Sequence, residues 1–178
     1  MSKHSYIFLL LLTLLPIGLA ESDFGFGTPV DGDSVAAFNI RPSIPPDGRG
    51  LPEGEGSAVE GFEVYAFMCG GCHGANGEGG PYDRLVADRE YSAEVPDHLL
   101  SVGNYWPYAT TLFDYINRAM PMTQPGSLSP DEVYAVVAFI LSENGIIAED
   151  EYLDASNLAD IEMPAKGIFA PNPDSFLP

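Results

Sequence analysis

Basic side chains are scarce in this sequence, and their scarcity excludes one class of partner. Seven lysines and arginines stand against 26 aspartates and glutamates, which gives a formal net charge of −19 at pH 7. A surface of this sign repels a phosphate backbone, so nucleic acid is excluded as a partner. The acidity fits two other roles equally well, which are solubility and steering towards a basic protein.

Long apolar runs are absent after the first twenty residues, so we expect no membrane span there, because such a helix needs about 20 apolar residues. The short run from Tyr6 to Leu15 follows Lys3 and precedes small residues that end at Ala20. This order predicts a secretory signal peptide. We therefore expect residues 1–20 to be removed and the product to be a soluble periplasmic protein.

Glycine and proline divide the rest of the chain into three parts. Residues 21–56 are rich in Gly, Pro and Asp, which predicts an extended N-terminal arm. Residues 57–145 have apolar residues at helical spacing and predict an all-α domain. Residues 146–178 form an acidic, proline-punctuated tail, whose apolar side chains are expected to pack on the domain.

The central part predicts three main helices. They are expected from Ser57 to Cys69, from Ala109 to Ala119 and from Ser129 to Asn144. The first and third begin with a serine that is followed three residues later by a glutamate, the pattern of a capping box. Between the first two helices the sequence predicts loops, with at most a short helix around residues 96–102.

Cysteine is scarcer still than basic residues, because the chain contains only Cys69 and Cys72. Two residues separate them and His73 follows at once, which is the motif for covalent attachment of a c-type haem. Thioethers at the two cysteines would hold the macrocycle at the end of a helix and place the histidine beneath the iron as a ligand. Gly70 and Gly71 leave the porphyrin face unobstructed. We therefore predict one covalent haem c.

Two other uses of the cysteine pair fit less well. A structural zinc site needs four Cys or His ligands. The chain after the signal peptide offers only this pair, His73 and His98, so every one of them would have to bind the metal. A thioredoxin-like pair opens a helix, where the helix N-terminus lowers the thiol pKa, whereas here the pair closes a helix.

The second axial ligand of the iron has four candidates, which are Met120, Met122, Met163 and His98. Met120 is favoured because it directly follows the middle helix and precedes Pro121, which fixes the local backbone and aims one side chain inward. Packing is the favoured role for Met122 and Met163, since a thioether fills irregular gaps well. A surface position is favoured for His98.

Three further residues are candidates for contact with the haem. Tyr105 and Trp106 precede the middle helix, where they are expected to line the haem crevice or reach its propionates, and core packing explains them equally well. Arg118 is a candidate partner of a propionate. The alternative for Arg118 is a solvated side chain or a pair with a protein carboxylate.

The residues around the haem motif resemble those of class I cytochromes c. Gly61 and Tyr65 stand eight and four residues before Cys69, as in the first helix of that family, and Phe139 is placed to cross them from the last helix. This resemblance implies the class I cytochrome c fold, with three to five helices around one haem.

A more specific resemblance extends over nearly the whole mature chain. The segments from Gly103 to Pro121 and from Ser127 to Leu141 look like the cytochrome subunits of bacterial molybdenum sulfite dehydrogenases and the Sox sulfane dehydrogenase cytochromes. That resemblance implies an electron-transfer protein, not an enzyme in its own right. It would take single electrons from a molybdopterin-containing dehydrogenase subunit and pass them to a downstream cytochrome or oxidase.

One departure from the resemblance concerns the number of haems. The sulfane dehydrogenase cytochrome often carries two, whereas this chain has one motif, so a mono-haem sulfite dehydrogenase subunit is the nearer analogue. Two other functions stay open. The first is a free, general-purpose electron shuttle that serves several donors without a dedicated enzyme partner. The second is a haem enzyme or sensor, which would need an open iron site.

Overall fold

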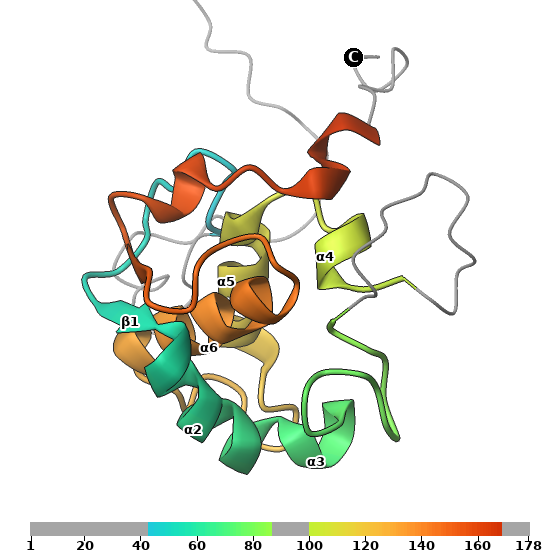
Figure 1. Ribbon diagram of the computed structural model, residues 1–178. Helices are drawn as coiled ribbons and strands as arrows, with labels where there is room; N and C mark the ends of the chain where they lie inside the picture. Colours follow the sequence, from blue (N-terminus) through green and yellow to red (C-terminus); the bar gives the residue numbers. More distant parts are fainter. Residues whose placement is uncertain (1–42, 87–99, 169–178) are drawn as a thin grey trace, which may run out of the picture. The chain divides into compact units, whose positions relative to one another are not determined.

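The computed structural model describes residues 43–86 and 100–168. Residues 21–42 of the predicted arm and His98 lie outside this part of the chain. The elements, in chain order, are β1 (Glu55–Ser57), α2 (Ala58–Met68), α3 (Gly70–His73), α4 (Val102–Tyr105), α5 (Ala109–Ala119), α6 (Pro130–Glu143), β2 (Tyr152–Asp154) and the 3₁₀ turns η2 (Leu158–Asp160) and η3 (Pro164–Ile168) (Figure 1).

The three predicted helices are confirmed, with bounds that agree to within a residue. At the start of α2 the Glu60 N–H donates to Ser57 Oγ at 3.4 Å, and the Ser57 N–H donates to Glu60 Oε2 at 2.8 Å. Ser129 and Glu132 form the same capping box at the start of α6. These reciprocal bonds satisfy backbone donors that a helix start leaves without partners.

The stretch between α3 and α5 contains one short helix in its described part. The sequence places it around residues 96–102, whereas the structure begins the single turn of α4 at Val102, and residues 96–99 lie outside the described part. The helices together confirm the expected all-α, class I cytochrome c fold.

A small antiparallel sheet is an addition that the sequence does not predict. Gly56 in β1 pairs with Leu153 in β2, which brings the end of the predicted arm against the predicted tail. Strands of three residues are too short to show a two-residue period, and their partners lie far apart in the sequence. The sheet forms because Leu153 is fully buried and holds the tail on the domain.

The core is centred on the contact between α2 and α6, and Figure 1 shows α6 between α2 and α5. A Cβ atom at Gly61 would overlap the carbonyl oxygen of Ala135, so glycine is what allows the two helices to touch. Beside that contact the rings of Tyr65 and Phe139 lie 4.7 Å apart. This packing fixes the C-terminal end of α2, where the cysteine motif begins.

The tail completes the core as well as covering it. Leu153, Leu158 and Met163 are almost fully buried in the same apolar cluster as the inner faces of α5 and α6. Within the described residues, no helix combines the length and the apolar composition that crossing a membrane requires.

Candidate functional site

The cysteine motif occupies the joint between α2 and α3. The Cys69 N–H donates to the carbonyl of Tyr65 at 2.8 Å, which continues the hydrogen bonding of α2 by one residue. The carbonyl of Cys69 then accepts the N–H groups of Cys72 and His73, each at 3.0 Å. One tight turn therefore holds both thiols and the imidazole.

The two thiols are free and lie in different environments. Cys69 is half-buried, whereas Cys72 is exposed. Two causes raise the pKa of the Cys69 thiol to about 11: burial, which is the larger, and the nearby Cys72. A thioredoxin-like pair needs a lowered thiol pKa, because the thiolate is the reactive form. The raised pKa therefore argues against Cys69 as the reactive thiol of such a pair.

The ring of His73 is oriented by the backbone. Its Nδ1 lies 2.7 Å from the carbonyl oxygen of Asp83. A carbonyl oxygen only accepts hydrogen bonds, so Nδ1 carries the hydrogen and Nε2 keeps its lone pair. Metal-ligating histidines are oriented in this way by a partner on the other ring nitrogen. The geometry prepares Nε2 to bind iron.

The loop that carries Asp83 is anchored to the motif itself. The Gly79 N–H donates to the carbonyl of His73 at 2.8 Å, and the Tyr82 N–H donates to the carbonyl of Cys72 at 3.1 Å. From the core side, the hydroxyl of Tyr65 donates to the carbonyl of Gly74 at 2.9 Å. Sequence reasoning missed Asp83 because the group that acts is a backbone carbonyl, which no side-chain pattern reveals.

The residues at this joint fit a covalently attached haem. Two thiols for the thioether bonds, an imidazole with a lone pair on Nε2 for the iron, and small residues between the cysteines are what a c-type centre requires. A Cβ atom at Gly71 would meet no other atom within 4 Å, so the space beside the motif is open. Cys69, Cys72 and His73 are the residues that would hold the group.

The methionine candidates for the second axial ligand differ in their surroundings. Met120 caps the C-terminus of α5, is partly buried against the core and donates its N–H to the carbonyl of Ile116 at 3.1 Å. Met163 is 3 % exposed inside the core, in agreement with the packing role favoured by the sequence. Met122 is 55 % exposed, so a packing role for it is wrong: the chain turns outward after Pro121. Met120 stays the predicted ligand.

The other candidate residues lie around α5. Trp106 is half-buried and meets the ring of Tyr115 edge-on, with centroids 5.6 Å apart, while Tyr105 is 44 % exposed. Arg118 Nε donates to Asp114 Oδ1 at 2.7 Å, and the same oxygen accepts the backbone N–H of Ile44 at 3.1 Å. Contact of Tyr105, Trp106 and Arg118 with a haem stays a prediction.

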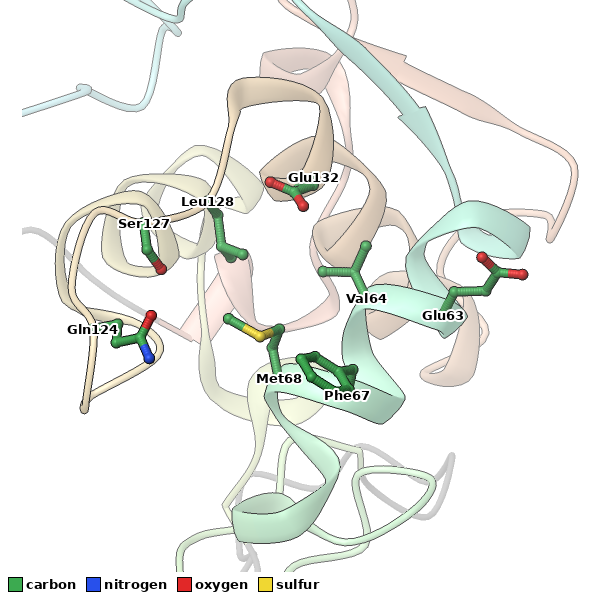
Figure 2. A pocket seen from close by; sticks show the side chains of 8 residues that line it. All are labelled: Glu63, Val64, Phe67, Met68, Gln124, Ser127, Leu128 and Glu132. Atoms are coloured by element: carbon green, nitrogen blue, oxygen red, sulfur yellow. The ribbon is translucent and has the colours of Figure 1, made fainter.

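A shallow groove of about 410 Å³ adjoins the motif (Figure 2). It lies between the last two turns of α2 and the loop that leads into α6. Val64, Met68 and Leu128 give it apolar walls, and the ring of Phe67 stands beside them. The sequence does not predict this groove, because its two walls lie about sixty residues apart in the chain.

Comparisons with known proteins agree with the geometry of the motif. Residues 58–144 match the family described as cytochrome c. The structure is similar to a chain in the crystal structure of the sulfane dehydrogenase SoxCD from Paracoccus pantotrophus, with a TM-score of 0.72 and 32 % sequence identity. That match covers 84 % of this chain and 73 % of the other. The search of curated proteins gave no significant match.

Proposed function

Because the chain belongs to the cytochrome c family, a family of electron-transfer proteins with covalent haem c, we propose that it accepts electrons from a molybdenum-containing dehydrogenase. The proposed donor oxidises sulfite or a related sulfur compound in the periplasm. The likeness to a chain of a sulfane dehydrogenase, over 84 % of this chain, is the observation that carries the choice of partner. A downstream cytochrome or oxidase would then receive the electrons.

Each residue of the motif has a distinct role in this function. When bound, haem c supplies a one-electron couple between ferric and ferrous iron. Cys69 and Cys72 would hold the ring, and His73 would present Nε2 to the metal, while the Asp83 carbonyl fixes the tautomer of His73. Met120 would supply the second protein ligand, whose thioether would favour the ferrous state and raise the reduction potential.

The single motif supports a mono-haem subunit. One pair of cysteines attaches one haem, so we infer a single-haem sulfite dehydrogenase subunit as the nearer functional analogue. Export supports the same function, because the N-terminal run from Tyr6 to Leu15 has the pattern of a signal peptide.

The proposal is tested by anaerobic mixing of the oxidised, haem-loaded protein with a purified molybdenum sulfite dehydrogenase from the same organism. Haem absorbance is followed after sulfite is added, with controls that omit the enzyme or the sulfite. Rapid reduction that needs both supports the proposal. A haem that stays oxidised in this mixture, yet is reduced by unrelated small donors, leaves the general electron shuttle in its place.

A further inference from the structure

Helix α2 carries apolar side chains on its exposed face as well as on its inner face. Its inner face packs on α6, but Val59 is 59 % exposed, Phe62 51 % and Phe67 88 %. Exposed aromatic residues gather where proteins bind one another. Nothing in the described part of the chain covers the ring of Phe67.

The exposed ring of Phe67 adjoins the groove beside the motif. Figure 2 shows Phe67 and Met68 at the C-terminal end of α2, with Leu128 across the groove. Because the groove has apolar walls, an apolar side chain from another molecule would contact both the walls and the ring. We call Phe62, Glu63, Phe67 and the groove together the α2 surface.

The α2 surface lies next to the point of haem attachment. Phe67 precedes Cys69 by two residues, and Met68 directly precedes Cys69. A molecule bound here would therefore stand close to the thioether edge of the haem. Electron transfer needs such closeness, because the protein's part in cofactor chemistry is to position the donor against the acceptor.

The charges around the α2 surface indicate the chemistry of its occupant. Glu63 and Glu132 stand at the groove, and Glu63 has no ion pair among the described residues. None of the described lysines and arginines, which are Arg49, Arg84, Arg118 and Lys166, lines the groove. The occupant must bring its own cations. A second copy of this chain, with its net charge of −19, and an anionic lipid surface are both disfavoured.

We propose that the α2 surface is the docking site for the electron-donating dehydrogenase, which would present an apolar side chain flanked by lysines or arginines. This inference rests on the proposed function and adds the place of contact. The exposed aromatic rings favour a lasting subunit contact over a brief redox encounter, because lasting interfaces are larger and more apolar.

The test compares Phe67→Ser with Tyr152→Ser in the full, haem-loaded protein. Both side chains are aromatic and about half or more exposed, but Tyr152 pairs with Ser57 at the other end of α2, about 15 Å from Phe67 along the helix. Calorimetry measures the affinity of each variant for the purified molybdenum sulfite dehydrogenase, and haem spectra check that the haem is intact. Phe67→Ser should weaken binding about 10- to 30-fold and Tyr152→Ser less than about 2-fold.

A charge variant gives a second measurement on the same surface. Glu63→Lys should weaken binding and make the affinity less sensitive to salt, because it removes an attraction to the partner's cations. Glu149→Lys, an exposed glutamate on the tail, is the matched control.

The possible outcomes separate this inference from the function on which it rests. A wild-type protein that neither binds the dehydrogenase nor receives its electrons overturns both. Wild-type binding that survives Phe67→Ser and Glu63→Lys overturns the docking site alone. Self-association of the wild type that Phe67→Ser abolishes would assign the surface to a second copy and overturn the proposal.

Discussion

The two sides of the candidate haem site are built differently. On the first side, the backbone of His73 bonds to Cys69 and Gly79 within 3.0 Å, and its ring is held by Asp83 at 2.7 Å. On the second side, the N–H of Met120 donates to the Ile116 carbonyl in α5. Residues 122–127, which follow, are all exposed.

We therefore expect the two sides to control different properties: the first the attachment of the haem, and the second the electronic state of its iron. The His73 side is fixed by a network that reaches into the contact between α2 and α6, so changes there should remove the haem or unfold the domain. The Met120 side depends on one side chain where the chain leaves a helix. A change there should alter the electronic state of the iron and leave the haem attached.

The largest effect is expected from Cys69→Ala combined with Cys72→Ala. Both thioethers are then lost, so no haem should stay on the chain after denaturation. Haem staining of the denatured protein on a gel measures this directly. Met122→Ala, which changes an exposed side chain on the other side, is the control and should stain as strongly as the wild type. Covalent haem in the double variant would contradict the assignment of the motif.

The next largest effect is expected from Gly61→Ala, which tests the base of the His73 side. Alanine gains about 1 kcal/mol of helix propensity over glycine, but its Cβ would overlap the Ala135 carbonyl, and overpacking of this kind costs about 1–3 kcal/mol. The overlap is with backbone and cannot be relieved by rotation of a side chain. The upper end of that cost, about 3 kcal/mol, less the gain of about 1 kcal/mol gives an expected net loss of about 2 kcal/mol in the free energy of unfolding, measured by guanidinium denaturation.

Gly167→Ala is the matched control for that measurement. A Cβ atom at Gly167 would meet no other atom within 4 Å, so its effect should stay within about 0.5 kcal/mol. Equal stability of Gly61→Ala and the wild type would mean that α2 and α6 separate without loss, and that the His73 side is less rigid than its contacts indicate.

Met120→Ala tests the second side. Covalent haem should be retained, while the reduction potential falls by on the order of 100 mV, because the thioether proposed to stabilise ferrous iron is gone. Spectroelectrochemical titration measures the potential, and Met122→Ala again serves as the control that should leave it unchanged. An unchanged potential in Met120→Ala would assign the ligand to another residue.

The sequence predicts the His73 side better than the other features for physical reasons. Cys69, Cys72 and His73 are adjacent in the chain, and capping serines mark where α2 and α6 begin, so local patterns carry the information. The Asp83 carbonyl and the pairing of β1 with β2 depend on contacts between distant segments. The exposure of Phe67 is invisible in the sequence, because helical spacing gives apolar positions and does not reveal which of them find a neighbour.

The smallest effect is expected at the start of α2, in Glu60→Ala. Hydrogen bonds from the backbone and hydroxyl of Ser57 hold the pKa of Glu60 below its usual value of 4.5. A carboxyl whose pKa is lower in the folded than in the unfolded chain stabilises the fold above the unfolded pKa, and this stabilisation is lost as the pH falls through the folded pKa. The variant should therefore lose about 0.5 kcal/mol of the free energy of unfolding at pH 7, a small loss because Glu60 is exposed. The difference from the wild type should shrink below pH 4.5. Unfolding curves across that range measure it, and a difference that stays constant with pH would show that the side chain acts through helix propensity and not through its charge.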